Sequence, residues 1–189
     1  MLKIGVQLLR PVEDVGEYFA DASALEAAGV DSLWTDRGSG HDRWMLLAGL
    51  AVVTSRVRLG ATIVPADVRV PDALCERLAA LHRLSRARGI VRIDPAVARC
   101  EDVIALVRQA AGDGLTIVLE ATAQPTQARV ERWAQVPAPE SRDAWRETRR
   151  TYEEMGASGV IVPFGPRLLD LLRRPDEEDD RSDLLVAQG

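Results

Sequence analysis

The stretch ALEAAGVDSLWT, residues 24–35, joins the end of a helix to the start of a buried strand. Upstream, apolar residues recur at helical spacing from Val15 to Leu25, and Gly29 follows the last turn. A glycine at this point can adopt the left-handed backbone that ends a helix. Residues 32–35 have the composition of a short strand that is covered on both faces. The stretch therefore predicts one helix-to-strand unit of a parallel sheet.

The same alternation extends over most of the chain. Short runs rich in β-branched residues alternate with longer segments of helical period, which is typical of βα units. The six predicted strands are 2–8, 32–35, 57–64, 90–93, 115–119 and 159–164. The predicted helices begin at Pro11 and Pro71 or cover 42–54, 101–111, 125–133, 142–155 and 167–173.

The number of strands limits the fold class. A complete eight-stranded barrel typically needs about 250 residues, with roughly 200 as a lower limit. Residues 1–175 supply six predicted strands. We therefore expect an α/β fold that is TIM-barrel-like, with a reduced or incomplete parallel barrel; an open α/β sheet is the alternative.

Acidic charge is concentrated at the end of the chain. Of 24 basic and 29 acidic side chains, residues 176–189 hold one base and six acids, which leaves residues 1–175 neutral. A neutral body has no electrostatic footprint for nucleic acid or an anionic membrane, so we expect neither as a partner. The pattern predicts one domain over residues 1–175 and a disordered acidic tail over 176–189.

Cysteine usage and missing motifs exclude further classes. Cys75 and Cys100 lie far from any metal-ligand spacing, so neither a zinc site nor a disulfide framework is expected. The chain has no GxSxG, no GxGxxG after the first strand and no P-loop. The first residues lack a signal-peptide pattern, and the longest apolar run has nine residues, against about 20 for a membrane helix. We expect a reduced, cytoplasmic protein without a metal.

Three phrases in the first half resemble the bacterial luciferase-like family of flavin- and deazaflavin-dependent oxidoreductases. They are EAAGVDSLW at 26–34, TSRVRLG at 54–60 and the leucine pattern from Pro71 to Ser85. The resemblance implies the luciferase-like form of the barrel, with FMN or a deazaflavin coenzyme of the F420 type at its mouth. It also implies an oxidoreductase or monooxygenase that acts on a small organic substrate.

Three departures from the family pattern bear on this chemistry. Many relatives carry Asp-His after the second strand, whereas this chain has Asp36-Arg37 and places its histidine at His41. A glycine-rich strand end is replaced by IVRID at 90–94, and a glycine pair before the phosphate-binding helix is replaced by EAT at 120–122. The alternative function is therefore a non-catalytic flavin-binding or dimer-partner protein that descends from the family.

Candidate site residues follow from their places at strand ends, because the chemistry of parallel barrels lies at the C-terminal ends of the strands. The candidates are Gln7, Asp36 with Arg37 and His41, Thr62, Asp94, Glu120 with Thr122, and Phe164.

The candidates divide into two predicted roles. We predict His41 and Asp36 as catalytic residues, since an imidazole can exchange protons near neutral pH. The predicted cofactor-binding residues are Gln7, Thr62, Asp94 and Thr122, among which the resemblance aligns Thr62 with a residue that touches the flavin ring.

A second arrangement of the same side chains remains open. Asp94 and Glu120 could form a carboxylate pair, although Arg92 could neutralise one of them. An unrelated isomerase or lyase using Asp94, Glu120 and His41 as acid and base groups is thus a third hypothesis.

The helix predicted at 42–54 is unusually apolar. Its centre, MLLAGLAVV from Met45 to Val53, has no polar side chain on any face, which is typical of a helix that is covered all round. In the family that the chain resembles, the equivalent helix packs against a second subunit. We therefore predict a homodimer through this helix.

Overall fold

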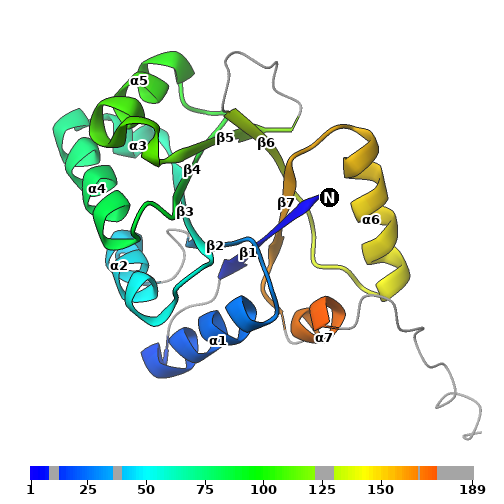
Figure 1. Cartoon of the computed structure of the whole chain (residues 1–189). Helices are drawn as coiled ribbons and strands as arrows, with labels where there is room; N and C mark the ends of the chain where they lie inside the picture. The colour runs from blue at the N-terminus through cyan, green and yellow to red at the C-terminus, as the bar shows by residue number, and fades with distance from the viewer. Residues whose placement is uncertain (9–12, 36–39, 122–129, 166, 174–189) are drawn as a thin grey trace, which may run out of the picture.

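Seven parallel strands close into a barrel in the computed structural model (Figure 1), which describes residues 1–8, 13–35, 40–121, 130–165 and 167–173. The strands follow one another around the ring in chain order, and β1 pairs with β7 to complete it. The strands are β1 (Lys3–Leu8), β2 (Ser32–Thr35), β3 (Arg58–Ile63), β4 (Gly89–Ile93), β5 (Thr116–Glu120), β6 (Val130–Gln135) and β7 (Gly159–Pro163).

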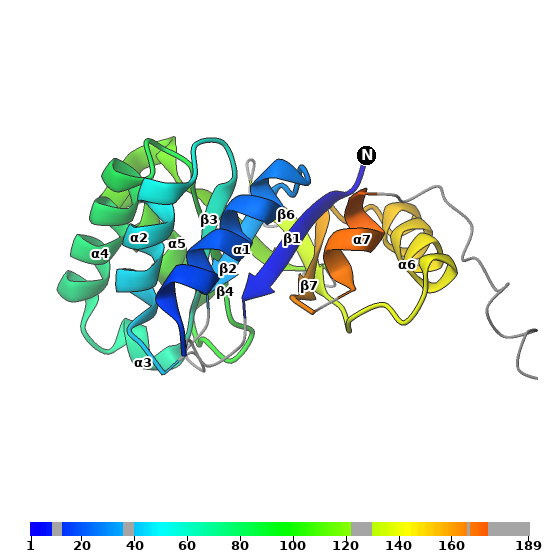
Figure 2. The same cartoon turned by 90° about the horizontal axis from the view of Figure 1, so that it is seen from below.

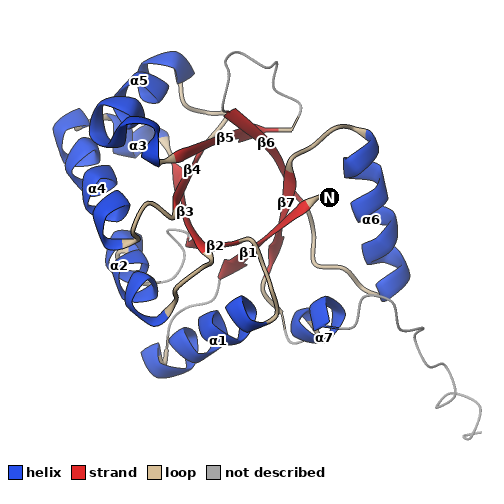
Figure 3. Ribbon diagram, in the orientation of Figure 1, coloured by secondary structure: helices blue, strands red, loops and turns tan. Residues whose placement is uncertain are grey.

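Helices surround the strand ring, as Figure 3 shows by colour. Seen from the side, α2, α4 and α5 lie on one side of the barrel, α6 and α7 lie on the other, and α1 crosses in front of the strands (Figure 2). They are α1 (Val15–Ala27), α2 (Arg43–Val53), α3 (Pro65–Val68), α4 (Pro71–Leu84), α5 (Cys100–Ala111), α6 (Arg142–Glu154) and α7 (Leu168–Arg173), with a 3-10 turn at Gly112–Gly114. Outward strand residues such as Val6, Leu33 and Leu59 are fully buried in the main hydrophobic core that the helices cover.

The predicted TIM-barrel-like class is confirmed, and the open sheet is excluded because the ring is closed. The strand count was one too low. The helix predicted at 125–133 is wrong for residues 130–133, which belong to β6, while 125–129 lie outside the described residues. Pro125 favours a helix start, but Trp133 faces the barrel interior, and Glu131 and Gln135, two residues away on either side, share its face, as in a strand. The predicted tail at 176–189 also lies outside the described residues.

Hydrogen bonds join the first two of the phrases that the sequence singled out. The carboxylate of Glu26, at the end of α1, accepts the backbone N–H groups of Ser55, Arg56 and Val57 at 2.9, 2.6 and 2.9 Å. Burial opposes ionisation of this side chain, but these three donors and the Arg56 charge outweigh it and lower the pKa of Glu26. The two phrases therefore occur together because one caps the turn that the other forms.

Two tryptophans fill the barrel interior. Trp34 from β2 and Trp133 from β6 are almost fully buried and meet edge to face, with ring centroids 6.0 Å apart. Ile90, Val118 and Ile161 complete the interior cluster. A small barrel can enclose two indoles only if other strands leave room for them, because protein interiors are already close-packed.

Glycines on three other strands supply that room. A Cβ added at Gly60 would lie 2.5 Å from the Trp34 ring, and one at Gly5 would lie 2.5 Å from its Nε1. A Cβ at Gly159 would lie 2.7 Å from the Trp133 ring. None of these glycines has the positive φ that favours glycine for backbone reasons. They are therefore required for space.

An ion cluster lies at the N-terminal end of the barrel, below the tryptophans. Glu131 accepts hydrogen bonds from the Lys3 ammonium, from Arg58 Nη1 at 3.3 Å and from Trp133 Nε1 at 2.7 Å. The Arg58 guanidinium also lies over the Trp133 ring, 5.4 Å from its centroid. Burial opposes ionisation, but the Lys3 hydrogen bond, the Arg58 charge and the indole donor outweigh it and lower the pKa of Glu131.

We expect Gly60→Ala to destabilise the protein by about 3 kcal/mol, since the new methyl group overpacks the interior against Trp34. Gly165→Ala is the control, because a Cβ there meets nothing within 4 Å. Urea unfolding measures both changes. If the contact with Trp34 is the cause, Trp34→Phe must cost less in the Gly60→Ala background than in the wild type. If the losses in the free energy of unfolding from Gly60→Ala and Trp34→Phe simply add in the double variant, the contact with Trp34 is not the cause.

Glu131→Gln should cost roughly 2 kcal/mol at pH 7, because it leaves two cations beside a half-buried neutral group. The lowered pKa means that the ionised carboxylate stabilises the fold above its unfolded pKa, about 4.3, and that this stability is lost as the pH falls through the folded value. Urea unfolding at pH 7 and pH 3 should therefore show the wild-type advantage shrinking in acid. Glu147→Gln, on exposed α6, is the control; an equal advantage at both pH values would be the contrary result.

Candidate functional site

The C-terminal mouth of the barrel is the place where the predicted candidates can meet. Gly5 and Gly60 face the interior tryptophans, so Gln7 and Thr62, two residues further along the same strands, also face inward. Arg92 on β4 is the register partner of Thr62 and shares its face. The strand geometry therefore brings these three side chains to one layer above the tryptophans.

Four side chains from four strands form a hydrogen-bonded set at this mouth, which we call the mouth quartet: Gln7, Arg92, Glu120 and Gln135. Arg92 Nη1 donates to Gln135 Oε1 at 2.9 Å, and Arg92 Nη2 donates to Glu120 Oε2 at 3.1 Å. Gln135 Nε2 donates to Gln7 Oε1 at 2.6 Å. The bonds connect β1, β4, β5 and β6 across the end of the barrel.

The mouth quartet extends from the buried interior to solvent. Gln7 and Arg92 are buried, Arg92 being 9% exposed, whereas the Glu120 side chain is 30% exposed and Gln135 is exposed. Arg92 Nε is buried and has no hydrogen-bond partner. The carboxylate of Glu120 and the amide of Gln135 are therefore accessible from solvent, whereas the guanidinium of Arg92 is buried beneath them.

The structure places the predicted cofactor-binding residues in different settings. Gln7 belongs to the mouth quartet, and Thr62 is half-buried beside Arg92. Asp94 closes the turn after β4, where its carboxylate accepts the Ala96 N–H at 2.8 Å. Thr122 lies outside the described residues.

The structure also bears on the alternative in which Asp94 and Glu120 form a carboxylate pair. Glu120 forms an ion pair with Arg92 at 3.1 Å, so Arg92 neutralises this carboxylate, as the sequence suggested for one of the two. Phe164 follows β7, and its backbone N–H donates to the Gln7 carbonyl at 2.8 Å. Phe164 therefore helps to fix the strand that carries Gln7.

The predicted catalytic residues do not both fall within the described part of the chain. His41 is exposed beside the start of α2, where it lines a cavity of about 280 Å³ with Arg43, Asp67 and Arg77. Asp42 caps this helix by accepting the Trp44 N–H at 2.8 Å. Asp36 and Arg37 lie outside the described residues, so the catalytic roles of Asp36 and His41 stay predictions.

Gln135 is the site residue that sequence reasoning missed. The sequence predicts a helix at 125–133, directly before Gln135. A residue that follows an outer helix is not expected to point into the barrel mouth, so Gln135 is absent from the predicted site residues. The signal that could have found it is the alternation of Glu131, Trp133 and Gln135, which points three non-aliphatic side chains to one face of a strand.

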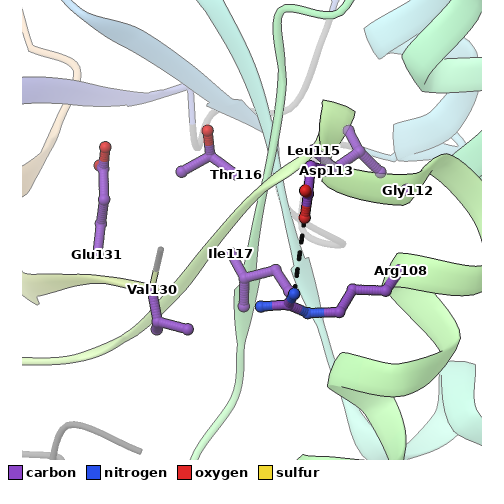
Figure 4. A pocket seen from close by; sticks show the side chains of 8 residues that line it. All are labelled: Arg108, Gly112, Asp113, Leu115, Thr116, Ile117, Val130 and Glu131. Carbon is purple, nitrogen blue, oxygen red and sulfur yellow. Dashed lines mark ion pairs between the residues drawn. The ribbon is translucent and has the colours of Figure 1, made fainter. Parts of the chain in front are cut away.

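A groove of about 370 Å³ lies at the opposite end of the barrel (Figure 4). It is formed where α5 ends and where β5 and β6 begin, and an ion pair of 3.6 Å between Arg108 and Asp113 crosses its wall. Residues at the N-terminal face of such barrels serve stability rather than chemistry. The mouth is therefore the candidate functional site.

The mouth quartet combines hydrogen-bond donors and acceptors that bond one another in this structure. Amide and guanidinium donors lie next to carboxylate and amide acceptors, and a ring edge with carbonyl oxygens and an N–H needs both.

Within the described residues, no cluster of His, Cys, Asp and Glu is arranged to hold a metal ion. No helix in the described ranges is long and apolar enough to cross a bilayer.

Comparisons with known proteins agree with this barrel. A family model described as luciferase-like monooxygenase matches residues 3–99, just over half of the chain. A protein of Mycobacterium tuberculosis, named as one of the coenzyme F420-dependent oxidoreductases, is 33% identical over 94 residues. The match covers 48% of this chain and 26% of that protein, so the chain spans about a quarter of the relative.

Two solved structures illustrate the range of similar folds. The coenzyme F420-dependent tetrahydromethanopterin reductase of Methanopyrus kandleri gives a TM-score of 0.54 at 16% identity, over 86% of this chain and 65% of its own. Tryptophan synthase of Mycobacterium tuberculosis gives 0.57 at 14% identity, over 92% and 91%. Such likeness shows the barrel alone, whereas the family model also matches the three sequence phrases. The chain belongs to the luciferase-like monooxygenase family.

Proposed function

We propose that the protein holds FMN or a deazaflavin coenzyme at the barrel mouth and acts as an oxidoreductase on a small organic molecule. The observation that carries this proposal is the mouth quartet, a polar set at the end of the barrel where this family places its chemistry. When bound, the cofactor supplies the hydride or oxygen chemistry. The names of the mycobacterial relative and of the reductase favour the deazaflavin.

The side chains of the mouth have separate tasks in this proposal. Gln7 and Thr62 orient the ring edge, because both face inward at the level of Arg92. Asp94 and Thr122 are proposed as further cofactor contacts. His41 and Asp36 are proposed to move protons at the substrate.

A non-catalytic flavin-binding or dimer-partner protein is the second candidate. The observation in its favour is that Arg92 and Glu120 fill the mouth with an ion pair at positions where the family uses small or glycine residues. A protein of this kind would bind the cofactor without turning over.

The wider setting is proposed on similar grounds. Residues 1–175 would work as one domain with an acidic tail at 176–189. Cys75 and Cys100 are free thiols, which agrees with a reducing compartment such as the cytoplasm.

We also propose a homodimer through α2. Within one chain the helix is covered on one face only: Leu47 and Leu50 are buried, but Met45 and Val52 are 73% and 83% exposed. Together with Leu84 of α4, Met45 borders an apolar groove of about 320 Å³ between the two helices. A second copy would remove this apolar surface from water, which favours association.

Titration of the purified protein with FMN and with coenzyme F420, read by fluorescence, tests the cofactor proposal. We expect saturable binding of one of them at tens of micromolar. Thr62→Val should weaken it about fivefold through the loss of one hydrogen bond. Thr116→Val makes the same change at the opposite end of the barrel and should leave it unaltered. Absence of binding to either coenzyme would remove the oxidoreductase proposal, whereas binding without turnover would favour the second candidate.

Light scattering at micromolar concentration tests the dimer. The wild type should have twice the mass of the chain, and Val52→Lys combined with Met45→Lys should give the monomer, because burying two ammonium groups opposes association. Val70→Lys is the control, since Val70 is similarly exposed but lies between α3 and α4. A monomeric wild type would contradict the interface.

A further inference from the structure

We infer that Arg92 selects the ligand of the mouth and that the group it selects is a planar carboxylate. The inference rests on the proposed function only in placing a small molecule at this end of the barrel. It goes further in naming the chemical group that the substrate carries.

The guanidinium of Arg92 is only partly used within the protein. Nη1 donates to Gln135 and Nη2 donates once to Glu120, whereas Nε has no partner. The N–H of Nε and one N–H of Nη2 point in the same direction and form a fork that matches the two oxygens of a carboxylate. Glu120 therefore engages Nη2 once and leaves Nε without an acceptor.

Burial makes the empty half of this fork unfavourable. Arg92 is 9% exposed, and a buried donor without an acceptor loses its water without replacement. A ligand carboxylate bound to both Nε and Nη2 would satisfy the missing bond. It would also keep the ion pair, because one carboxylate replaces another.

The surroundings allow this exchange. The Glu120 side chain is already 30% exposed and can turn towards water, while Asp94 is engaged in its own turn. Gln135 is held from the other side by Gln7 at 2.6 Å, so the amide that receives Nη1 keeps the guanidinium plane fixed. Among the described residues of the quartet, Arg92 is the cation and Glu120 is the competing anion.

The Nε–Hε signal of Arg92 in the nitrogen–proton spectrum of the full chain tests the inference. Arg92→Lys identifies the signal by its absence. Benzoate is the probe, and benzamide is the uncharged control of the same shape. We expect benzoate to shift this signal saturably and benzamide to leave it in place.

Two variants test the fork itself. Glu120→Gln removes the internal competitor and should raise benzoate affinity about tenfold, the effect of one charge-assisted hydrogen bond. Arg92→Lys keeps the charge but loses the fork, so its benzoate affinity, followed by tryptophan fluorescence, should fall at least tenfold. Arg150→Gln on exposed α6 is the matched control and should bind as the wild type does.

Several outcomes would overturn the inference. These are equal binding of benzamide, unchanged affinity in Glu120→Gln, or full affinity in Arg92→Lys. If FMN and coenzyme F420 both fail to bind while benzoate shifts the Arg92 signal, the cofactor proposal fails and this inference stands. If a cofactor binds but benzoate does not move the Arg92 signal at any concentration, the cofactor proposal stands and this inference fails.

Discussion

The contact between two interior tryptophans and the glycines opposite them is the constraint on which this barrel depends. Trp34 and Trp133 meet edge to face, and a side chain at Gly5, Gly60 or Gly159 would have to occupy the space of an indole ring. Larger barrels fill their interior with layers of medium-sized aliphatic side chains. Here two indole rings, together with three glycines that leave room for them, fill the interior of a barrel of seven described strands.

This packed layer separates two polar ends with different tasks. Below it, Glu131 holds Lys3 and Arg58 in a half-buried ion cluster that joins β1, β3 and β6. Above it, the mouth quartet joins β1, β4, β5 and β6 and opens to solvent at Gln135. Each end holds one buried guanidinium nitrogen without a hydrogen-bond partner among the described residues, Arg58 Nη2 in the lower cluster and Arg92 Nε at the mouth, but only Arg92 lies at the end where chemistry is expected. An incompletely satisfied polar group at the functional end of a barrel points to a ligand that completes it.

Family membership and chemistry rest on different residues in this protein. The phrases that show the family form caps, turns and buried strands, as the bonds from Glu26 to residues 55–57 illustrate. Two residues of the mouth, Arg92 and Glu120, lie in segments where the sequence departs from the family pattern. A shared barrel supports many unrelated reactions, so the function has to be argued from the mouth quartet rather than from the fold.

Local sequence determined much of this protein. Glycine caps, helical stripes and short β-branched runs fixed most helices and six strands, because these signals act within a few residues. The placement of Gln7 and Thr62 at strand ends followed from the same signals. The numbers of charged residues and cysteines set the expected partners, because they can be counted in the sequence without knowledge of the fold.

Only the tertiary structure decided the rest. Closure of the ring required β6, whose sequence VERWAQ lacks a regular apolar alternation, because a strand gains its stability from neighbours that are distant in sequence. The partnership of Arg92 with Glu120 and Gln135 joins residues 28 and 43 positions apart, and no local pattern encodes such a contact. The need for glycine at Gly60 likewise became visible only when Trp34 was placed against it, because space in a core belongs to the packed whole.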